Sequence, residues 1–350
     1  MTGTAHHHDH QASADGRDGS APARPAVEVR QLSKSFGEVE AVRGVSFEVA
    51  TGEVFGFLGP NGAGKTTTIN MLCTLATPTA GSAQVAGHDV VRERDDVRRH
   101  IGLVFQDPTL DGYLTAEQNL RLHAELYGVD SSIVAARMRQ VLEMVGLWER
   151  RGAPVQTFSG GMRRRLEIAR GLMHSPRVLF LDEPTIGLDP QTRSSIWSYI
   201  RLLQETEEIT IFMTTHYMDE AEFCDRIAIM DRGEIVALDT PGALKARVGA
   251  DRVTIRTEDD AAAIAALAER FGIEARTAEG AVSFYVPSGE EFVPRLFAEL
   301  GVPIKSVSVS RPTLDDVFMS YTGTTIRDAE ESLGRQANKM IMQAMTGARR

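Results

Sequence analysis

A glycine-rich loop between an apolar strand and a helix constrains the fold of this 350-residue chain more than any other segment. Residues 59–67 read GPNGAGKTT, and the apolar run 54–58 before them predicts a buried strand. The loop fits the pattern G-x-x-x-x-G-K-[ST], in which glycines let backbone N–H groups approach phosphate oxygens that a Cβ would exclude. A helix beginning at Lys65 directs its positive N-terminal end at the same anion. The segment therefore predicts a nucleotide phosphate site at a strand end of an α/β fold.

Each part of this loop has a predicted role. Lysine is rare in the chain, which makes Lys65 inside the loop more informative, and its ammonium can reach β- and γ-phosphate oxygens. The Thr66 hydroxyl can ligate Mg²⁺. The other loop residues are expected to contact the nucleotide as well: Gly59, Pro60, Asn61, Gly62, Ala63, Gly64 and Thr67. An ordinary glycine-rich turn is the alternative, and the preceding strand argues against it.

Two acidic residues follow a second apolar run at 178–181. Such a run predicts a buried parallel strand that presents Asp182 at its carboxyl end, beside the phosphate loop. There Asp182 can hold Mg²⁺ directly or through water. Glu183, next in line, can polarise a water for in-line attack on the γ-phosphorus. The alternative is that the two acids only cap a strand.

Two further polar residues stand at predicted strand ends. Gln106 follows the strand expected at 101–105, and its amide carbonyl can join a Mg²⁺ shell. His216 follows the apolar strand expected at 210–215, and a neutral imidazole there can hydrogen-bond the γ-phosphate. Taken alone, a glutamine would be a surface residue and a histidine a structural one.

Residues 158–162, Phe-Ser-Gly-Gly-Met, open a predicted helix between the loop and the acidic strand. Ser159 suits a helix N-cap, and capping alone could account for it. A cap needs neither Gly160 nor Gly161, however, and bare backbone at a helix N-terminus forms an anion site. Because the Lys65 loop already serves one nucleotide, we expect this second phosphate contact to be made in trans, in the site of another subunit.

The order of predicted elements divides the chain. Residues 27–245 form an α/β core with a helical subdomain at about 107–175, and the composition shifts past Pro241. Residues 252–309 give strand, helix, strand, strand, helix, strand, the order of a small split-βαβ, ferredoxin-like unit, so a C-terminal α+β domain is expected over 251–323. Residues 1–26 are expected to be a disordered polar arm, and 324–350 a flexible or helical tail.

Together these motifs resemble those of the ATP-binding cassette ATPases, the nucleotide-binding subunits of ABC transporters. The resemblance covers about residues 27–245 and rests on GPNGAGKTT (59–67), Gln106, FSGGM (158–162), VLFLDEPT (178–185), GLDP (187–190) and His216. It implies a P-loop NTPase of the ABC cassette type, in which a mixed sheet core carries a helical subdomain. The small α+β C-terminal domain would follow this cassette.

The resemblance also implies roles for individual residues. The substrate would be ATP with Mg²⁺, held by the loop, by Thr66 and Gln106, and by Asp182 as the acidic metal partner. Lys65, Glu183 and His216 would be catalytic, with Glu183 as the base. Asp189 would communicate across a head-to-tail homodimer of cassettes. In it, Ser159, Gly160 and Gly161 complete the opposite subunit's site. Phe36 would stack on adenine where the family usually has tyrosine.

The signature and the C-terminal segment favour one branch of the family. Phe158 and Met162 replace the usual leucine and glutamine, and residues 313–323 are similar to a segment of daunorubicin-resistance-like ATPases, which energise multidrug or antibiotic export. Four residues at helical spacing predict a stripe that docks this segment on the cassette: Leu314, Val317, Phe318 and Tyr321.

Composition and hydropathy complete the functional prediction. A net charge of −10 argues against a general nucleic-acid binder. No apolar run reaches the roughly 18–20 residues that cross a bilayer. The resemblance then implies an integral-membrane permease on a separate chain, with this protein peripheral on the cytoplasmic face of the membrane. The function that the resemblance implies is ATP-driven export of a drug, antibiotic or other hydrophobic compound.

The alternative is a non-transport cassette ATPase of DNA repair, translation or assembly. Such proteins typically carry coiled-coil insertions, zinc-binding cysteines or two fused cassettes. The sequence shows none of these features.

Overall fold

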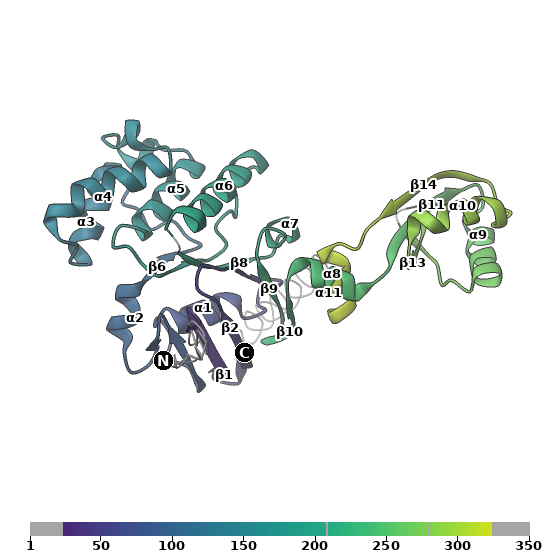
Figure 1. Cartoon of the computed structure of the whole chain (residues 1–350), viewed down its shortest axis with the longest axis horizontal. Coiled ribbons are helices and arrows are strands. Elements are labelled where there is room, and N and C mark those ends of the chain that lie inside the picture. The colour runs from purple at the N-terminus through teal and green to yellow at the C-terminus, as the bar shows by residue number, and fades with distance from the viewer. Residues whose placement is uncertain (1–23, 208, 279, 324–350) are drawn as a thin grey trace, which may run out of the picture.

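The computed structural model describes residues 24–207, 209–278 and 280–323. Most of the arm expected over residues 1–26 and the whole tail expected over 324–350 lie outside these ranges. The described chain forms a large two-sided cassette with a smaller domain at one end (Figure 1). Within the described ranges, no helix combines the length and apolarity needed to cross a membrane.

A six-stranded sheet forms the centre of the cassette, with strand order β10-β9-β3-β8-β7-β6. Five strands run parallel, and the edge strand β10 is antiparallel to β9. Their bounds are β3 Val54–Leu58, β6 Ile101–Val104, β7 Val178–Leu181, β8 Thr210–Thr215, β9 Arg226–Asp231 and β10 Glu234–Asp239. Strands β3, β7 and β8 are buried along their whole length, because both faces are covered. Such double burial explains their uninterrupted apolar runs, and the strands predicted at 54–58 and 178–181 are confirmed.

A second, antiparallel sheet covers one side of the central sheet (Figure 1). Its order is β2-β1-β4-β5, with β1 Val27–Phe36, β2 Val39–Val49, β4 Ala80–Val85 and β5 His88–Asp89. Phe47 of β2 stacks on Phe55 of β3 with ring centroids 5.5 Å apart, so aromatic packing joins the two sheets. Helices α1 (Lys65–Leu72) and α2 (Arg94–His100) belong to this side.

Helices cover the other side of the central sheet (Figure 1). The helical subdomain contains α3 (Ala116–Leu126), α4 (Ser131–Met144) and α5 (Gly160–Gly171), with short turns at Trp148–Arg150 and Val155–Thr157. Thr115 begins α3 through a capping box with Gln118, in which each side chain satisfies the other residue's backbone N–H. Helices α6 (Pro190–Glu207) and α7 (Met218–Ala221) flank β8 along the chain.

The small domain has the predicted ferredoxin-like order. Its elements are β11 Asp251–Thr257, α9 Asp260–Ala266, a π turn Leu267–Phe271, β12 Arg276–Ala278, β13 Ala281–Val286, α10 Gly289–Glu299 and β14 Ile304–Ser310. The strands pair in the order β12-β13-β11-β14, entirely antiparallel. This is the arrangement of a split βαβ unit, and it confirms the sequence prediction. The domain has an apolar core of its own.

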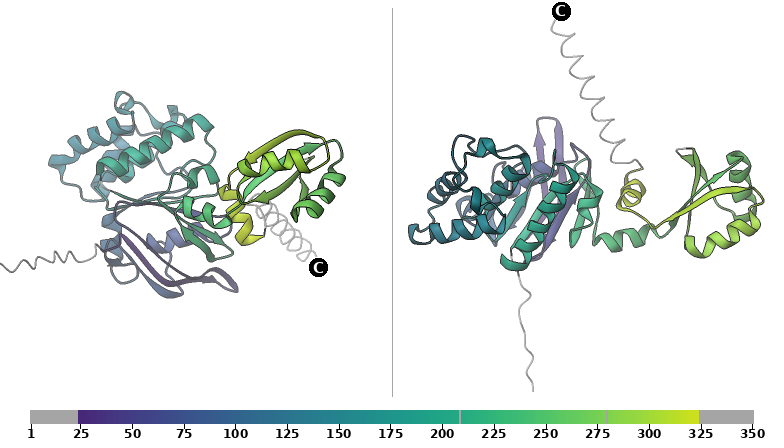
Figure 2. Two further views of the ribbon diagram at one scale, coloured as in Figure 1. Left: turned by 45° about the vertical axis from the view of Figure 1, so that its right-hand side comes forward. Right: turned by 90° about the horizontal axis from the view of Figure 1, so that it is seen from above.

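The chain returns to the cassette after the small domain. Helix α8 (Pro241–Val248) leads out of the cassette and α11 (Leu314–Thr322) packs beside it (Figures 1 and 2). Leu314, Val317 and Phe318 are buried in the same apolar cluster as the helical subdomain and the central sheet. The predicted stripe is right at these three positions. It is wrong at Tyr321, which lies in the last turn and is 39% exposed.

Truncating Phe318 to alanine is expected to lower the free energy of unfolding by about 3–5 kcal/mol, because the change opens a cavity under α11. Urea denaturation followed by circular dichroism measures this value. Tyr321→Ala removes a comparable ring from the exposed last turn and serves as the matched control, with a much smaller loss. Equal losses for the two variants would contradict the assignment of α11 to the cassette core.

Candidate active site

The phosphate loop joins β3 to α1 and is wedged between neighbouring strands. A Cβ on Gly59 would lie 2.2 Å from the Met230 carbonyl oxygen, and one on Gly64 would lie 2.5 Å from the Ala41 carbonyl oxygen. Gly64 also has φ +107°, which side chains with a Cβ rarely adopt. Two of the loop glycines are therefore required by packing inside the chain, besides any contact with phosphate.

Lys65 begins α1 and lies inside the loop, with 4% of its side chain exposed. Its ammonium donates hydrogen bonds to the carbonyl oxygens of Gly59, at 2.7 Å, and Pro60, at 3.1 Å. The same nitrogen lies 3.3 Å from Oε1 of Glu183. The structure thus brings the predicted phosphate-binding lysine directly against the predicted base.

Asp182 follows β7 at the carboxyl edge of the sheet. Its Oδ1 accepts hydrogen bonds from the hydroxyls of Thr214, at 2.5 Å, and Thr66, at 3.2 Å. Burial raises the pKa of Asp182 above its ordinary value, although the two hydroxyls act in the opposite direction. A buried carboxylate in this position gains stability from a neighbouring cation. With Thr66 it supplies the oxygen ligands that Mg²⁺ prefers, so the residues fit that ion.

Glu183 has an unusual backbone and a buried carboxylate. Its φ of +44° lies in the left-handed region, where a residue with a Cβ is strained. Oε2 lies 3.3 Å from Nδ1 of His216, and no other described residue donates a hydrogen bond to it. Burial alone would raise the pKa of Glu183, but the His216 imidazole and the Lys65 ammonium lower it by more. The carboxylate is therefore ionised at neutral pH.

His216 and Thr214 come from the end of β8. The ring of His216 packs against Tyr217 with centroids 4.1 Å apart, which places Nδ1 beside Glu183. The sequence predicts Thr214 only as part of a strand, yet its hydroxyl donates to Asp182 and accepts from the N–H of Glu183, at 2.9 Å. The strand register pairs Leu181 with Met213, so the next residues of the two strands meet.

Gln106 makes no hydrogen bond or ion pair with the group formed by Lys65, Asp182, Glu183 and His216 in the described structure. It lines a cleft of about 280 Å³ together with Gly160, Pro184 and Leu188. The cleft joins the predicted metal ligand to the start of α5. In the described structure the side chains that hydrogen-bond Asp182 are those of Thr66 and Thr214, not Gln106.

The Ser-Gly-Gly segment begins α5 as expected, but its two glycines differ. Oγ of Ser159 accepts a hydrogen bond from the N–H of Met162, at 3.2 Å, and so caps the helix. A Cβ on Gly161 would lie 2.4 Å from Cγ2 of Thr192, so the contact between α5 and α6 requires this glycine. Gly160 is exposed, and the nearest atom to its Cβ would be Cδ2 of Leu188, at 3.6 Å. Packing within the chain therefore explains Gly161 but leaves Gly160 unexplained.

Asp189 also has a local role. Its carboxylate accepts hydrogen bonds from the N–H of Thr192, at 3.0 Å, and from the Thr192 hydroxyl, at 2.6 Å. These bonds lower the pKa of Asp189 and cap α6, whose first residue is Pro190. An aspartate directly before the proline that begins a helix is the sequence signal for this capping role.

Phe36 presents its ring at the end of β1 and is 55% exposed. Nζ of Lys34 lies over the ring, 4.9 Å from its centroid, in a cation–π contact that occupies one of the two faces. An exposed, flat aromatic face at this position is able to stack on a nucleobase.

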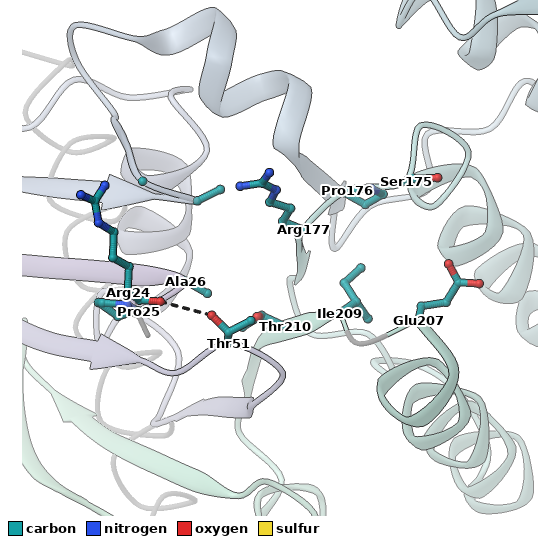
Figure 3. A pocket seen from close by; sticks show the side chains of 12 residues that line it. Arg24, Pro25, Ala26, Thr51, Ser175, Pro176, Arg177, Glu207, Ile209 and Thr210 are labelled. Atoms are coloured by element: carbon teal, nitrogen blue, oxygen red, sulfur yellow. Dashed lines mark hydrogen bonds between the residues drawn. The ribbon is translucent and has the colours of Figure 1, made fainter. Parts of the chain in front are cut away.

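A further cavity of the described chain lies away from this site. It measures about 570 Å³ and is lined by Arg24, Arg177, Glu207, Thr210 and neighbouring residues (Figure 3). Arg177 and Thr210 stand at the amino ends of β7 and β8, whereas Glu183 and His216 follow the carboxyl ends. This cavity therefore lies at the opposite edge of the sheet from Glu183 and His216.

A phosphate loop, an acid pair, a strand-end histidine and an open helix start, arranged on this sheet with a helical subdomain, define an ATP-binding cassette ATPase. Residues 42–186 match the model of the ABC transporter family, and residues 240–322 match the C-terminal domain of DrrA1-3-like ATP-binding proteins. The chain belongs to the family of ABC transporter ATP-binding proteins and carries the DrrA-type C-terminal domain. It is an ATP-hydrolysing transporter subunit.

Curated relatives span nearly the whole chain. The linearmycin resistance ATP-binding protein LnrL of Bacillus subtilis (strain 168) is 38% identical over 311 residues, covering 86% of this chain and 100% of the relative. The daunorubicin resistance ATP-binding protein DrrA3 of Streptomyces coeruleorubidus is 41% identical over 314 residues, covering 88% of this chain and 99% of the relative. A dimeric cassette, MJ0796, solved with ADP and Pi, has a TM-score of 0.55 at 28% identity, covering 61% of this chain and 98% of its own.

Proposed function

We propose that Glu183 is the general base of ATP hydrolysis in this cassette and that the hydrolysis drives export of a hydrophobic drug or antibiotic. The observation that carries the proposal is the contact of two buried residues, Lys65 and Glu183, with the partly buried His216, beside Asp182. One cation, one ionised carboxylate and one imidazole meet where the phosphate loop ends, which is the constellation that phosphoryl transfer to water requires.

Lys65 and the loop bind the phosphates in this proposal. The N-terminal end of α1 adds its partial positive charge to that of the ammonium. To reach the β- and γ-oxygens, Lys65 exchanges its contact with Glu183 for the substrate. Loss of that contact raises the pKa of Glu183, since the ammonium is one of the groups that lower it. Substrate binding thus makes Glu183 a stronger base.

Mg²⁺ fits the site through Asp182 and Thr66, with Gln106 as a further oxygen ligand from the neighbouring cleft. When bound, the ion would neutralise phosphate charge and polarise the γ-phosphorus. The raised pKa of Asp182 supports this assignment, because a buried carboxylate without a strong ion pair is stabilised by a divalent cation.

Glu183 then orients the attacking water. Oε2 is the carboxylate oxygen with unused acceptor capacity within the described structure, and it can accept the proton of a water. His216, 3.3 Å from the same oxygen, is placed to hydrogen-bond the γ-phosphate. The ring of Phe36 would stack on adenine, at the exposed end of β1.

A second copy of the chain completes the site. Gly160 has open backbone at the start of α5, and this helix end can bind the γ-phosphate of a nucleotide held by another subunit. Asp189, which caps the neighbouring α6, would lie in the same interface. The dimeric state of the solved cassette MJ0796 supports a homodimer here, and the trans role of Gly160 requires its two subunits to be arranged head to tail.

The transport function needs a membrane partner. Because the chain belongs to the ABC transporter ATP-binding proteins, we assign the transport pathway to a separate permease, with this chain on the cytoplasmic face of the membrane. The names of the LnrL and DrrA3 relatives refer to resistance to linearmycin and daunorubicin, and we assign this chain a cargo of that kind. A role in DNA repair, translation or assembly has no comparable support.

Export can be tested by expressing the chain with a candidate permease, a membrane protein of the same organism that binds this cassette, in inside-out vesicles. ATP-dependent uptake of fluorescent daunorubicin is the expected result, with none for vesicles that carry Glu183→Gln. A panel of other hydrophobic antibiotics extends the test to the cargo. If no membrane protein of that organism binds the cassette or changes its ATPase rate, the transport assignment fails.

A further inference from the structure

Arg164 on α5 is one of the most enclosed charges of the cassette, with its residue only 7% exposed. Its guanidinium donates to four main-chain carbonyl oxygens. Nε binds Pro184 at 2.6 Å, and Nη1 binds Phe105 at 2.5 Å. Nη2 binds Asp182 at 3.0 Å and Glu183 at 3.2 Å. The Glu167 carboxylate, 3.0 Å from Nη1, balances the charge. One side chain therefore holds three consecutive carbonyls around the base.

These contacts surround a strained residue. Glu183 keeps its φ of +44° only if the surrounding structure fixes it, since the left-handed region costs on the order of 1–3 kcal/mol. Thr214 holds the N–H of Glu183, and Arg164 holds its carbonyl group and those on either side. The backbone is clamped on both sides of the base. A planar guanidinium with five donors can span four carbonyls, whereas a lysine ammonium cannot.

The same face of α5 holds the loop that contains Gln106. Arg164 binds the carbonyl oxygen of Phe105, Oε1 of Glu167 accepts from the N–H of Thr109 at 2.8 Å, and Arg170 donates to the Thr109 carbonyl at 2.9 Å. The spacing of 164, 167 and 170 places the three side chains along one face of the helix. The loop after β6 is therefore fixed to α5, not only to its own strand.

We propose that Arg164 is a positioning residue that sets the placement of Glu183 according to the position of α5. Helix α5 begins at Gly160, so a second subunit that binds Ser159–Gly161 contacts the same helix whose Arg164 side chain holds residues 182–184. A shift of α5 on dimer closure would therefore also move Glu183 into its catalytic position. The inference rests on the proposed role of Glu183 as the base and on the signature segment acting in trans.

Arg164→Lys tests the clamp, because it keeps the positive charge but not the fork of donors. We expect kcat for ATP to fall about 10–100-fold, while the Kd of ATP changes less than about threefold. Arg137→Lys is the matched control. Arg137 also donates to a carbonyl, that of Leu172 at 2.9 Å, and pairs with Glu207 at 3.0 Å, but these contacts lie away from the site. Its kcat should stay within about twofold of wild type.

A double-mutant cycle separates positioning from general stabilisation. If Arg164 acts through the base, Arg164→Lys should lower the residual single-turnover rate of a Glu183→Gln chain by less than about threefold. Full additivity of the two losses would overturn the proposal, and so would near-normal kcat for Arg164→Lys in the otherwise unchanged chain. Near-normal turnover by Glu183→Gln alone would instead refute the proposed base. If Arg164→Lys does not fold, Arg164→Gln undergoes the same comparison.

Discussion

Glu183→Gln is expected to reduce the ATP turnover of the purified chain by about a thousandfold while ATP binding persists. Glutamine keeps the size of the side chain and its place between Lys65 and His216, but it cannot take a proton from water. The assay is the release of inorganic phosphate, with nucleotide affinity measured separately. ATP should also hold the variant as a dimer in size-exclusion chromatography, because reopening depends on hydrolysis.

Glu53→Gln is a suitable control for this experiment. Glu53 is another buried carboxylate of the cassette, 8% exposed, and it pairs with Arg226 at 2.6 Å just before β3. Its removal should cost stability without a comparable loss of turnover. Near-normal hydrolysis by Glu183→Gln, measured beside this control, would exclude Glu183 as the base.

Heterodimers of a Lys65→Ala chain and a Gly160→Asp chain are expected to regain ATPase activity that neither homodimer has. In such a pair, the intact loop of one chain faces the intact Ser-Gly-Gly segment of the other, so one of the two composite sites is complete. The activity should approach about half that of a wild-type dimer if the two sites act independently. Phosphate release by heterodimers isolated through two different affinity tags measures this recovery.

The structure shows that Gly160, and not Gly161, is the position of the Ser-Gly-Gly segment to substitute in this experiment. An aspartate at position 161 would collide with Thr192 and disturb the fold of its own chain, whereas position 160 is open to solvent. The matched control places both substitutions on one chain and pairs it with wild type, which leaves no complete composite site. If the two kinds of heterodimer show equal activity, the segment does not act in trans.

The sequence predicts those parts of the fold that local chemistry dictates. The phosphate loop and the strands at 54–58 and 178–181 are recognisable because burial on both faces demands continuous apolar runs. The small domain is recognisable because its six elements alternate in a clear order. In contrast, the sequence does not predict β4, β5 and α2, because β4 consists of small and polar residues and charged residues dominate α2 without a sustained period.

The sequence does not predict contacts that arise from the packing of distant elements. Thr214 meets Asp182 because of the strand register, and Arg164 meets residues 182–184 because of the position of α5 on the sheet. A glycine is required at position 161 because a side chain there would collide with α6, besides any contact with phosphate. A threonine near the carboxyl end of a buried strand beside the acidic strand is a signal that could have revealed Thr214.

The return of the chain through α11 makes the small domain an insertion and not an appendage. Residues 251–310 leave from α8 and come back beside it, so both ends are anchored to one surface of the cassette. A module tethered twice samples a much smaller volume than one on a single linker, and its local concentration at that surface stays high. Deleting the chain from residue 251 onward would remove α11 from the core. Excising residues 251–310 and joining residue 250 to residue 311 through a short linker would instead leave the cassette complete, with α11 still in place.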